Sequence, residues 1–319
     1  MFPPAVLSRL RCPKCGAGLH QPAPDGLVCE QGHAVPVRDG YLDASNTPPD
    51  RETARLFASF GYEHVRFDRL PPEDELVWRR YFGDVPFDEL REGVALDAGC
   101  GTGRFSRFLA ERMAAVVALD GSEGVLAAAR NLEAHANVSV VRADFRSAPL
   151  APESFDFICC IGVLHHLEAP RQAFDALVRL LAPGGRLLVF LYSRPPRGTL
   201  RAAVVDASTT LRRLTLHLPG AVVQALSLLI AAALYVGLVL PGRLGEAFGI
   251  EPLAALPLRM YRRLVPWSLW HNVFDVLKAP LERRYVWAEV EHWYRAAGLE
   301  VERVQEDDGL VILARRPLP

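Results

Sequence analysis

The sequence has no excess of charge of either sign: 36 Lys and Arg stand against 37 Asp and Glu, a formal net charge of −1 over 319 residues. A dedicated nucleic-acid-binding protein is expected to carry a clearly basic balance or patch, so composition does not point to a polyanionic partner. The opening residues MFPPAVLSRL also lack the long apolar run of a secretory signal. We therefore expect a cytoplasmic protein, with one catalytic domain and smaller appended pieces at this length.

Cysteine is scarce and unevenly placed. Three of the six cysteines lie within the first 29 residues, and a CxxC pair there is followed by a CxxxH pair. Two such pairs can close a tetrahedral metal site, and four protein ligands leave no open position for catalysis. The alternative is a ribbon that has lost its metal. We predict a small ribbon with one structural zinc, held by Cys12, Cys15, Cys29 and His33.

A glycine-rich loop follows an apolar run in VALDAGCGTGRFSRFLA. The run ends on Asp97, and Gly99, Gly101 and Gly103 allow positive φ and close approach of the backbone to a ligand. A second apolar run, AVVALD, ends at Asp120, at the distance where a carboxylate can receive a ribose diol. A nicotinamide dinucleotide site would need GxGxxG without a preceding acid, so that class of cofactor is disfavoured.

Further apolar runs follow in a regular order. NVSVVRAD ends at Asp144, FDFICCIGVLHHL gives a fourth run, and LLAPGGRLLVFLY ends a helix in a Pro-Gly-Gly turn before a fifth. Five alternations of strand and helix predict a doubly wound α/β fold with a parallel sheet and right-handed crossovers. Such sheets bind ligands at the carboxyl ends of their strands.

In that order, LDAGCGTGR, VVALDGS, RADF, FDFICCIGVLHH and LAPGGRLLVF resemble the successive motifs of class I S-adenosylmethionine-dependent methyltransferases. The chain is most similar to the ubiquinone/menaquinone-methyltransferase-like superfamily, over about residues 57–316. The resemblance implies a Rossmann-like, seven-stranded sheet and S-adenosylmethionine (SAM) as cofactor. Gly121 stands where that family usually carries a hydrophobic residue. The implied cofactor contacts are Asp97, Gly99, Cys100, Gly101, Gly103, Asp120, Gly121, Asp144, Phe145 and Ile161.

Two histidines follow the fourth apolar run. Methyl transfer from a sulfonium is a displacement, so the protein aligns the reactants and supplies a base where the acceptor carries a proton. We predict His165 or His166 as this base, and the alternative is that they cap the strand and shape the pocket. Asn-Pro-Pro-Tyr and Pro-Cys, the signatures of amino-methylating and cytosine-C5-methylating enzymes, are absent there. Cys159 and Cys160 are expected in the core.

The ribbon carries a second resemblance. LRCPKCGAGL and LVCEQGHAVPVRDGYLD are similar to the zinc-ribbon partners that activate tRNA and ribosome-related methyltransferases, and to the zinc end of ribosomal-RNA guanine methyltransferases. This resemblance covers only about the first 43 residues. It implies a possible RNA substrate without deciding for one.

A long insertion separates the fifth strand from the C-terminal helix. Its run Gly220–Leu240 has no charge and is long enough to span a bilayer. The chain must nevertheless return to complete the sheet with YVWAEVEHWYRAAGLE and EVERVQEDDGLVILARR, and no second uncharged span exists to bring it back. We therefore expect a helical cap over the acceptor pocket, whose apolarity suits shallow peripheral membrane contact or a greasy substrate.

The predicted parts are a zinc ribbon (1–45), a helical lead-in or lid (46–92), a cofactor-binding core (93–192), the helical cap (193–284), and a C-terminal helix and strands that complete the core (285–319). The leading hypothesis is a SAM-dependent methyltransferase for a small or lipid-like acceptor. Its rival is a tRNA or ribosomal-RNA methyltransferase that uses the ribbon for recognition. A module that keeps the fold without turnover is disfavoured, because the cofactor acids and glycines are all present.

Overall fold

The computed structural model describes residues 2–23, 25–45, 48–306 and 309–319. Its contacts divide the chain into two units: unit 1 holds Met1–Leu70, Arg80–Arg194 and Leu281–Pro319, and unit 2 holds Pro71–Arg79 and Pro195–Pro280. The predicted lead-in begins at residues 46 and 47, which lie outside the described residues.

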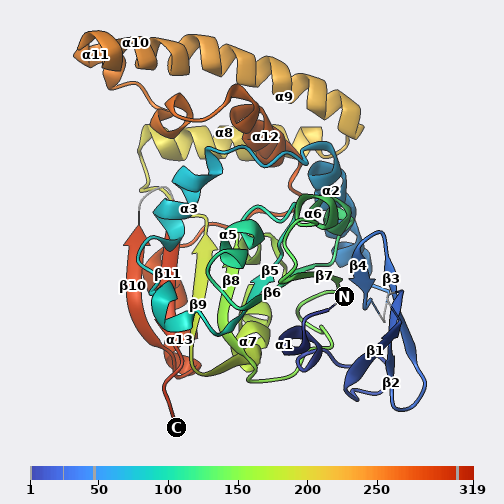
Figure 1. The fold of residues 1–319 in the computed structure, drawn as a ribbon. Coiled ribbons are helices and arrows are strands. Elements are labelled where there is room, and N and C mark those ends of the chain that lie inside the picture. The colour runs from blue at the N-terminus through green and yellow to red at the C-terminus, as the bar shows by residue number, and fades with distance from the viewer. Residues whose placement is uncertain (1, 24, 46–47, 307–308) are drawn as a thin grey trace. The chain divides into compact units, whose positions relative to one another are not determined.

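Unit 1 is built on one mixed sheet (Figure 1). Its strand order is β1-β2-β3-β4-β7-β6-β5-β8-β9-β11-β10. Strands β4 to β9 pair in parallel, whereas β9, β11 and β10 pair antiparallel at one end and β1 to β4 at the other. The strands are β1 (Leu19–Ala23), β2 (Gly26–Cys29), β3 (Ala34–Arg38), β4 (Tyr41–Asp43), β5 (Val94–Ala98), β6 (Ala115–Asp120), β7 (Val138–Arg142), β8 (Phe155–Ile161), β9 (Leu181–Leu191), β10 (Glu300–Glu306) and β11 (Leu310–Arg315).

The order of the parallel strands places the switch point of the sheet between β5 and β8, since β6 and β7 continue on one side and β9 on the other. Ligands of doubly wound folds bind beside that point, at the carboxyl ends of the strands. Strand β5 is buried along its whole length and β6 likewise, as expected for parallel strands covered on both faces. The loops after β5, β6, β7 and β8 therefore converge on one edge.

Helices cover both faces of this sheet. Alternate residues of β6 separate the two cores: Ala118 packs toward α6, and Val117 and Leu119 pack in the larger cluster with α7 and α13. The helices of unit 1 are α1 (Pro4–Leu7), α2 (Arg51–Arg66), α4 (Phe87–Leu90), α5 (Ser106–Ala110), α6 (Gly124–Asn131), the 3₁₀ turn η1 (Leu164–His166), α7 (Pro170–Leu180) and α13 (Trp287–Ala296). Helix α3 (Asp74–Phe82) begins in unit 2 and ends in unit 1.

The N-terminal ribbon is continuous with the sheet. Strand β4 pairs in parallel with β7, with Leu42 opposite Val141, and Leu10 forms an isolated bridge to Leu150. All four of these side chains belong to the same buried cluster. The sheet therefore has eleven strands, four more than the seven that the resemblance implies, because the ribbon strands extend its β7 edge.

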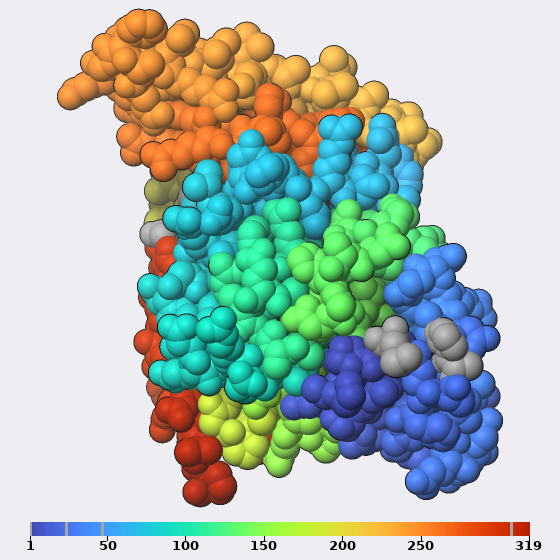
Figure 2. All heavy atoms as spheres, in the orientation of Figure 1, coloured from blue at the N-terminus to red at the C-terminus, as the bar shows by residue number. Residues whose placement is uncertain are grey.

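Unit 2 is helical, and α12 packs against both α8 and α9 within it. Helices α9 and α10 continue into one another through a π-helical turn, and Figure 2 shows their orange atoms open to view along the helix. Of the described residues, one helix, Gly220–Phe248, is long and apolar enough to cross a membrane. The elements are α8 (Leu200–Thr215), α9 (Gly220–Leu234), η2 (Tyr235–Val239), α10 (Leu240–Phe248), α11 (Glu251–Ala254), η3 (Arg259–Arg262) and α12 (Pro266–Lys278).

Candidate functional site

The loop after β5 takes a conformation that only glycine adopts freely. Gly99, Gly101 and Gly103 have φ values of +81°, +53° and +81°. A Cβ on Gly99 would also lie 2.4 Å from Val163 Cγ2, in the loop after β8. Main-chain bonds hold the loop in this conformation, since Gly99 N and Cys100 N donate to the Leu119 carbonyl oxygen and Gly103 N donates to that of Cys100. The loop lies on the edge where the sheet binds ligands.

Two acidic side chains hold this loop in place. Asp97 accepts hydrogen bonds from Ser106 Oγ (2.6 Å) and Cys159 Sγ (3.4 Å), so it joins β5 to α5 and β8. Asp120 Oδ2 accepts the Gly101 N–H at 3.0 Å and thereby ties the end of β6 to the glycine loop. Burial raises the pKa of Asp97 to about 6, against the opposing effect of the Ser106 hydroxyl.

Asp120 lies at the end of β6, where a ribose diol is expected. Its Oδ1 accepts hydrogen bonds from Ser122 N (2.7 Å) and Ser122 Oγ (2.6 Å). Because each carboxylate oxygen offers two lone pairs, these bonds orient the carboxylate and leave capacity for another donor. The side chain is largely buried but retains an exposed fraction of 8%.

Asp144, after β7, is engaged by a neighbour. Arg146 Nε lies 2.9 and 3.0 Å from its two carboxylate oxygens, and the Arg146 guanidinium also donates to Thr53 Oγ1 at 2.8 Å. Thr53 stands in the first turn of α2, which Asp50 caps. The structure thus connects the loop after β7 to α2. Phe145 is nearly buried beside this pair and Ile161 is half-buried at the end of β8.

Helix α2 lies across the loops after β5 and β6. A Cβ built on Gly121 would come within 2.2 Å of Phe57 Cζ, and one built on Gly101 or Gly124 would lie 2.8 Å from the His64 ring. Gly61 packs in the same way on the backbone of Glu123. Positions 57, 61 and 64 therefore form one stripe at helical spacing that faces the predicted cofactor loops.

Sequence reasoning missed Phe57 and His64. Both residues lie in the predicted helical lead-in (46–92), for which no site residue was predicted. The available signal was a glycine at position 61 inside a helical pattern, four residues after an aromatic and three before a histidine. Within the described chain, His64 Nδ1 is buried and has no hydrogen-bond partner. An unsatisfied buried polar atom facing the glycine loop suits a site shaped for a ligand.

The two candidate bases have different surroundings. His165 is fully buried and stacks on Tyr192 with ring centroids 3.9 Å apart; burial lowers the pKa of its imidazole well below the ordinary value, with His166 and Arg284 adding to the effect. His166 Nδ1 lies 2.6 Å from the Leu281 carbonyl oxygen, to which it must donate. That bond leaves the Nε2 lone pair available to accept a proton.

His166 also meets α2. Its ring centroid lies 5.0 Å from that of Phe60, so the same helix contacts the glycine loop through His64 and the histidine turn through Phe60. The structure therefore brings the loops after β5, β6, β7 and β8 under one helix. Asp97 lies beneath that group, enclosed by Ser106 and Cys159.

The four predicted metal ligands form a separate cluster in the ribbon. Their ligand atoms lie within 4.8 Å of one another, with Cys15 Sγ 3.7 Å from Cys29 Sγ and Cys12 Sγ 3.6 Å from His33 Nδ1. A tetrahedral zinc with Zn–S bonds of about 2.3 Å separates its sulfur ligands by about 3.8 Å. The cluster therefore has the dimensions of a zinc site, and its sulfurs are too far apart for a disulfide.

Backbone geometry supports ligation at both turns. Gly16 follows the CxxC pair with φ +74°, and Gly32 precedes His33 with φ +78°, as in tight metal-binding turns. Burial raises the pKa of Cys12, but the N–H groups of Lys14 and Cys15 outweigh this and lower it to about 6. A thiolate is the form that binds metal.

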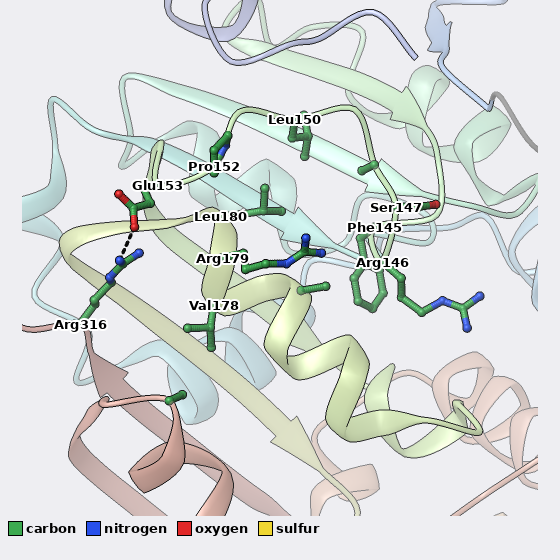
Figure 3. Close-up of a pocket in the computed structure, with 13 residues that line it drawn as sticks. Phe145, Arg146, Ser147, Leu150, Pro152, Glu153, Val178, Arg179, Leu180 and Arg316 are labelled. Atoms are coloured by element: carbon green, nitrogen blue, oxygen red, sulfur yellow. Dashed lines mark hydrogen bonds and ion pairs between the residues drawn. The ribbon is translucent and has the colours of Figure 1, made fainter. Parts of the chain in front are cut away.

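One surface pocket is lined in part by the loop after β7 but does not reach the glycine loop (Figure 3). It runs from Phe145 along α7 to Arg316, and shares only Phe145 with the predicted cofactor contacts. Two of its three arginines are engaged: Arg316 pairs with Glu153, and Arg146 pairs with Asp144. It is therefore not where the acceptor is expected.

Comparison with known proteins identifies the central part of unit 1. Residues 96–189 match the family model described as a methyltransferase domain. The chain is 34% identical over 112 residues to a ubiquinone biosynthesis O-methyltransferase of Pseudomonas fluorescens, a stretch covering 34% of this chain and 48% of the relative. It is 40% identical over 102 residues to a demethylmenaquinone methyltransferase of Clavibacter sepedonicus, covering 32% and 42%.

The chain spans about half or less of the length of those curated relatives. Among solved structures, the Burkholderia thailandensis 1,6-didemethyltoxoflavin-N1-methyltransferase aligns with a TM-score of 0.48 and 17% identity, over 94% of this chain and all of that one. The matched segment contains the glycine loop, Asp120, Asp144 and both histidines. The ribbon, α2 and the insertion lie outside it.

Proposed function

We propose, from the premise that residues 96–189 form a methyltransferase domain, that the chain is a SAM-dependent methyltransferase acting on a small or lipid-like acceptor. The observation that carries the proposal is the bond from Gly101 N to Asp120, which joins the glycine loop to the acid at the end of β6. This bond links the loop proposed to receive the methionine end of the cofactor to the carboxylate proposed to accept the ribose, at the carboxyl edge where doubly wound sheets bind ligands. The fold alone would not support an activity.

The residues present suit SAM. Gly99, Gly101 and Gly103 admit the methionine end of the cofactor, and Asp120 accepts from the ribose hydroxyls. In place of the hydrophobic residue absent at Gly121, the ring of Phe57 supplies an aromatic wall for the adenine. Asp144 and Phe145 border the same end, and Cys100 and Ile161 complete the lining.

The chemistry supplied by bound SAM is a methyl group on a sulfonium. The protein aligns the acceptor with it and removes a proton where the acceptor has one. His166 is the better base, because Nδ1 is fixed by the Leu281 carbonyl and Nε2 is the free lone pair. His165 is buried and stacked on Tyr192, and serves to position its neighbour.

The acceptor is proposed to be apolar. The curated relatives are named for ubiquinone biosynthesis and demethylmenaquinone, both quinone chemistry. The helical insertion is rich in aliphatic residues, which suits a greasy acceptor. We place the chain in the cytoplasm, with the insertion as its point of peripheral membrane contact.

The ribbon is proposed to hold one structural zinc through Cys12, Cys15, Cys29 and His33. The separation of their ligand atoms and the lowered pKa of Cys12 support this. With four protein ligands the metal has no open position, so its role is to stabilise the ribbon.

Calorimetry with S-adenosylhomocysteine tests the proposal. Wild-type protein is expected to bind it, and Asp120→Ala to lose about 1–3 kcal/mol of binding free energy because ribose hydroxyls are left unpaired. Half-buried Asp175→Ala is the matched control, because that aspartate pairs with Arg171 on α7, outside the candidate site. Absence of binding by the wild type would overturn the proposed function. A thermal-shift screen with quinones, phenols and tRNA in the presence of S-adenosylhomocysteine then identifies the acceptor class.

A further inference from the structure

We infer that the outer face of the helix Gly220–Phe248 docks on an anionic lipid bilayer, with the helix lying in the plane of the surface. The inference deepens the proposed function by naming the surface from which a lipid-like acceptor would be taken. It rests on unit 2 alone.

The helix has its large aliphatic side chains outside. The side chains most open to solvent are those of Leu229 (69% exposed), Val236 (65%) and Phe248 (74%). They are accompanied by the exposed Val222, Leu228, Leu240 and Leu244. Over the candidate span only 22% of residues are buried, whereas the core helix of a water-soluble protein is mostly buried.

The packed side of the same helix carries smaller groups, both apolar and polar: Val223, Ala231 and Val239 are buried there. Ser227 is fully buried and accepts a hydrogen bond at 3.0 Å from Trp270 of α12. Farther along, Gly242 and Gly245 are buried, and a Cβ on Gly242 would lie 2.4 Å from Arg262 Nε. The buried positions thus hold nothing larger than valine, whereas leucines and Phe248 are exposed. Small residues at helix contacts and large ones outside are typical of lipid-facing helices.

The two charges of this helix are both paired. Arg243 donates to the carbonyl oxygens of Arg262 (2.6 Å) and Leu264 (3.1 Å) and to Tyr235 Oη (2.8 Å). Glu246 pairs at 2.7 Å with Arg262, whose side chain is only 1% exposed. Both charges therefore have partners within unit 2, although the Glu246 side chain remains 46% exposed. The side chains of this helix that are most open to solvent are aliphatic or aromatic.

The net charge of the insertion indicates what binds to this face. The insertion Pro195–Pro280 holds nine Lys and Arg against four Asp and Glu, a formal charge of +5, although the whole chain carries −1. Arg213, Arg259 and Arg263 are exposed. Basic residues around an apolar helix favour anionic headgroups. A second copy of the chain is disfavoured on the same face, because it would bring two insertions of like charge together.

The helix lies on the membrane and does not cross it. α12 packs on both α9 and α8, and α8 carries Arg201, Asp206, Arg212 and Arg213. If α9 spanned the bilayer, these packed neighbours would enter hydrocarbon, where charged side chains are costly. Only the outer face of the 29-residue helix therefore meets lipid. At 1.5 Å per residue that face is about 43 Å long.

Vesicle flotation of the full chain tests the inference. Wild-type protein is expected to float with vesicles of phosphatidylcholine mixed with phosphatidylglycerol, and far less with phosphatidylcholine alone or at high salt. The double variant Leu229→Gln, Val236→Gln should lower the partition coefficient by about tenfold or more, since it removes two of the most exposed aliphatic groups. Leu318→Gln, at a residue of unit 1 that is 66% exposed, is the matched control and should float as the wild type does.

Several outcomes overturn the inference. One is a wild type that stays with the soluble fraction at every lipid composition; another is a double variant that floats unchanged. A dimer that forms without lipid and dissociates in the double variant would assign the face to a second copy, and protein released from cell membranes only by detergent would show a spanning helix. Flotation requires no methyl transfer, so its failure leaves S-adenosylhomocysteine binding to decide the proposed function separately.

Discussion

The ring of Phe57 lies against Gly121, so closely that a Cβ on the glycine would stand 2.2 Å from Phe57 Cζ. The two residues come from different elements: Phe57 from the middle of α2, and Gly121 from the first position after β6. An aromatic ring from a preceding helix thus fills the space that a side chain at position 121 would need. The ring of Phe57 can occupy this position only because residue 121 has no side chain.

Removing the Phe57 ring should weaken cofactor binding. Phe57→Ala is expected to lower the affinity for S-adenosylhomocysteine by about 1–3 kcal/mol, the usual effect of losing an aromatic partner of a nucleobase. Gly121→Leu alone should also weaken binding, because its side chain collides with Phe57. Combining the two should restore part of the affinity, since leucine can then occupy the vacated space. Calorimetry measures all three, with exposed Val65→Ala on the same helix as control; full affinity in Phe57→Ala would show that the ring plays no part.

Substitutions of His165 and His166 should have different effects on kcat. His166→Phe is expected to lower kcat by about 10²- to 10⁴-fold when the acceptor must lose a proton, and to leave S-adenosylhomocysteine affinity intact. His165→Phe keeps an aromatic ring on Tyr192 and should retain most of kcat. The measurement is the rate with the acceptor found by thermal shift, followed against pH. Equal losses in the two variants would contradict the assignment of the base to His166.

The glycine loop and the two acids after β5 and β6 could be predicted from the sequence, because local chain chemistry determines them: three glycines at positive φ, and carboxylates at strand ends. The cluster of Cys12, Cys15, Cys29 and His33 likewise follows from spacing, and the structure brings these ligand atoms together.

Contacts between distant segments could not be predicted in the same way. The pairing of β4 with β7 joins residues about a hundred positions apart, and a short strand such as Tyr41–Asp43 has little pattern of its own. Phe57 could not be assigned to the site without knowing where α2 lies. The sequence shows that the run Gly220–Leu240 is apolar, but it does not show which side of the helix packs and which is exposed. A helix that is apolar all round has no hydrophobic periodicity to distinguish the two sides.

The buried carboxylate of Asp97 should make stability depend on pH. Its pKa is raised to about 6 by burial, so between about pH 4 and pH 6 the folded state holds a proton that the unfolded state has lost. This residue's contribution to stability therefore falls as pH rises through that window. Asp97→Asn should remove the cost, with a net gain of about 2 kcal/mol at pH 8 after allowing for one weakened hydrogen bond, and a smaller gain at pH 5. Urea unfolding at both pH values measures this against half-buried Asp175→Asn; a gain that is the same at both would show that ionisation of Asp97 is not its source.

Loss of metal from the ribbon should lower the stability of the whole of unit 1. Cys12 and Cys29 belong to the same buried cluster as Leu96 and Leu187 in the central strands. A chelator, or Cys12→Ser, is therefore expected to lower the temperature of the main unfolding transition by several degrees, without a separate ribbon transition. Calorimetric scans together with metal analysis check this. Zinc-free protein with an unchanged Tm would mean that the cluster does not depend on metal.

The insertion should be removable, because unit 1 holds both of its ends. Arg194 N donates to Tyr285 O at 2.8 Å, and Ser193 forms a parallel bridge with Tyr285, so the chain enters and leaves the insertion at adjacent points. A short Gly-Ser linker in place of 196–280 can therefore span the gap without distorting β9 or α13. The proposed cofactor contacts all lie in unit 1. The shortened protein is therefore expected to bind S-adenosylhomocysteine with an affinity within about threefold of wild type, since linker exchange changes loop entropy only slightly. Methyl transfer to the apolar acceptor should be lost, because the segment proposed to present that acceptor is gone. Calorimetry and a turnover assay of the shortened protein check these two expectations separately. Retained turnover would show that the acceptor is bound by unit 1 alone. Lost cofactor binding would show that the insertion also supports the glycine loop.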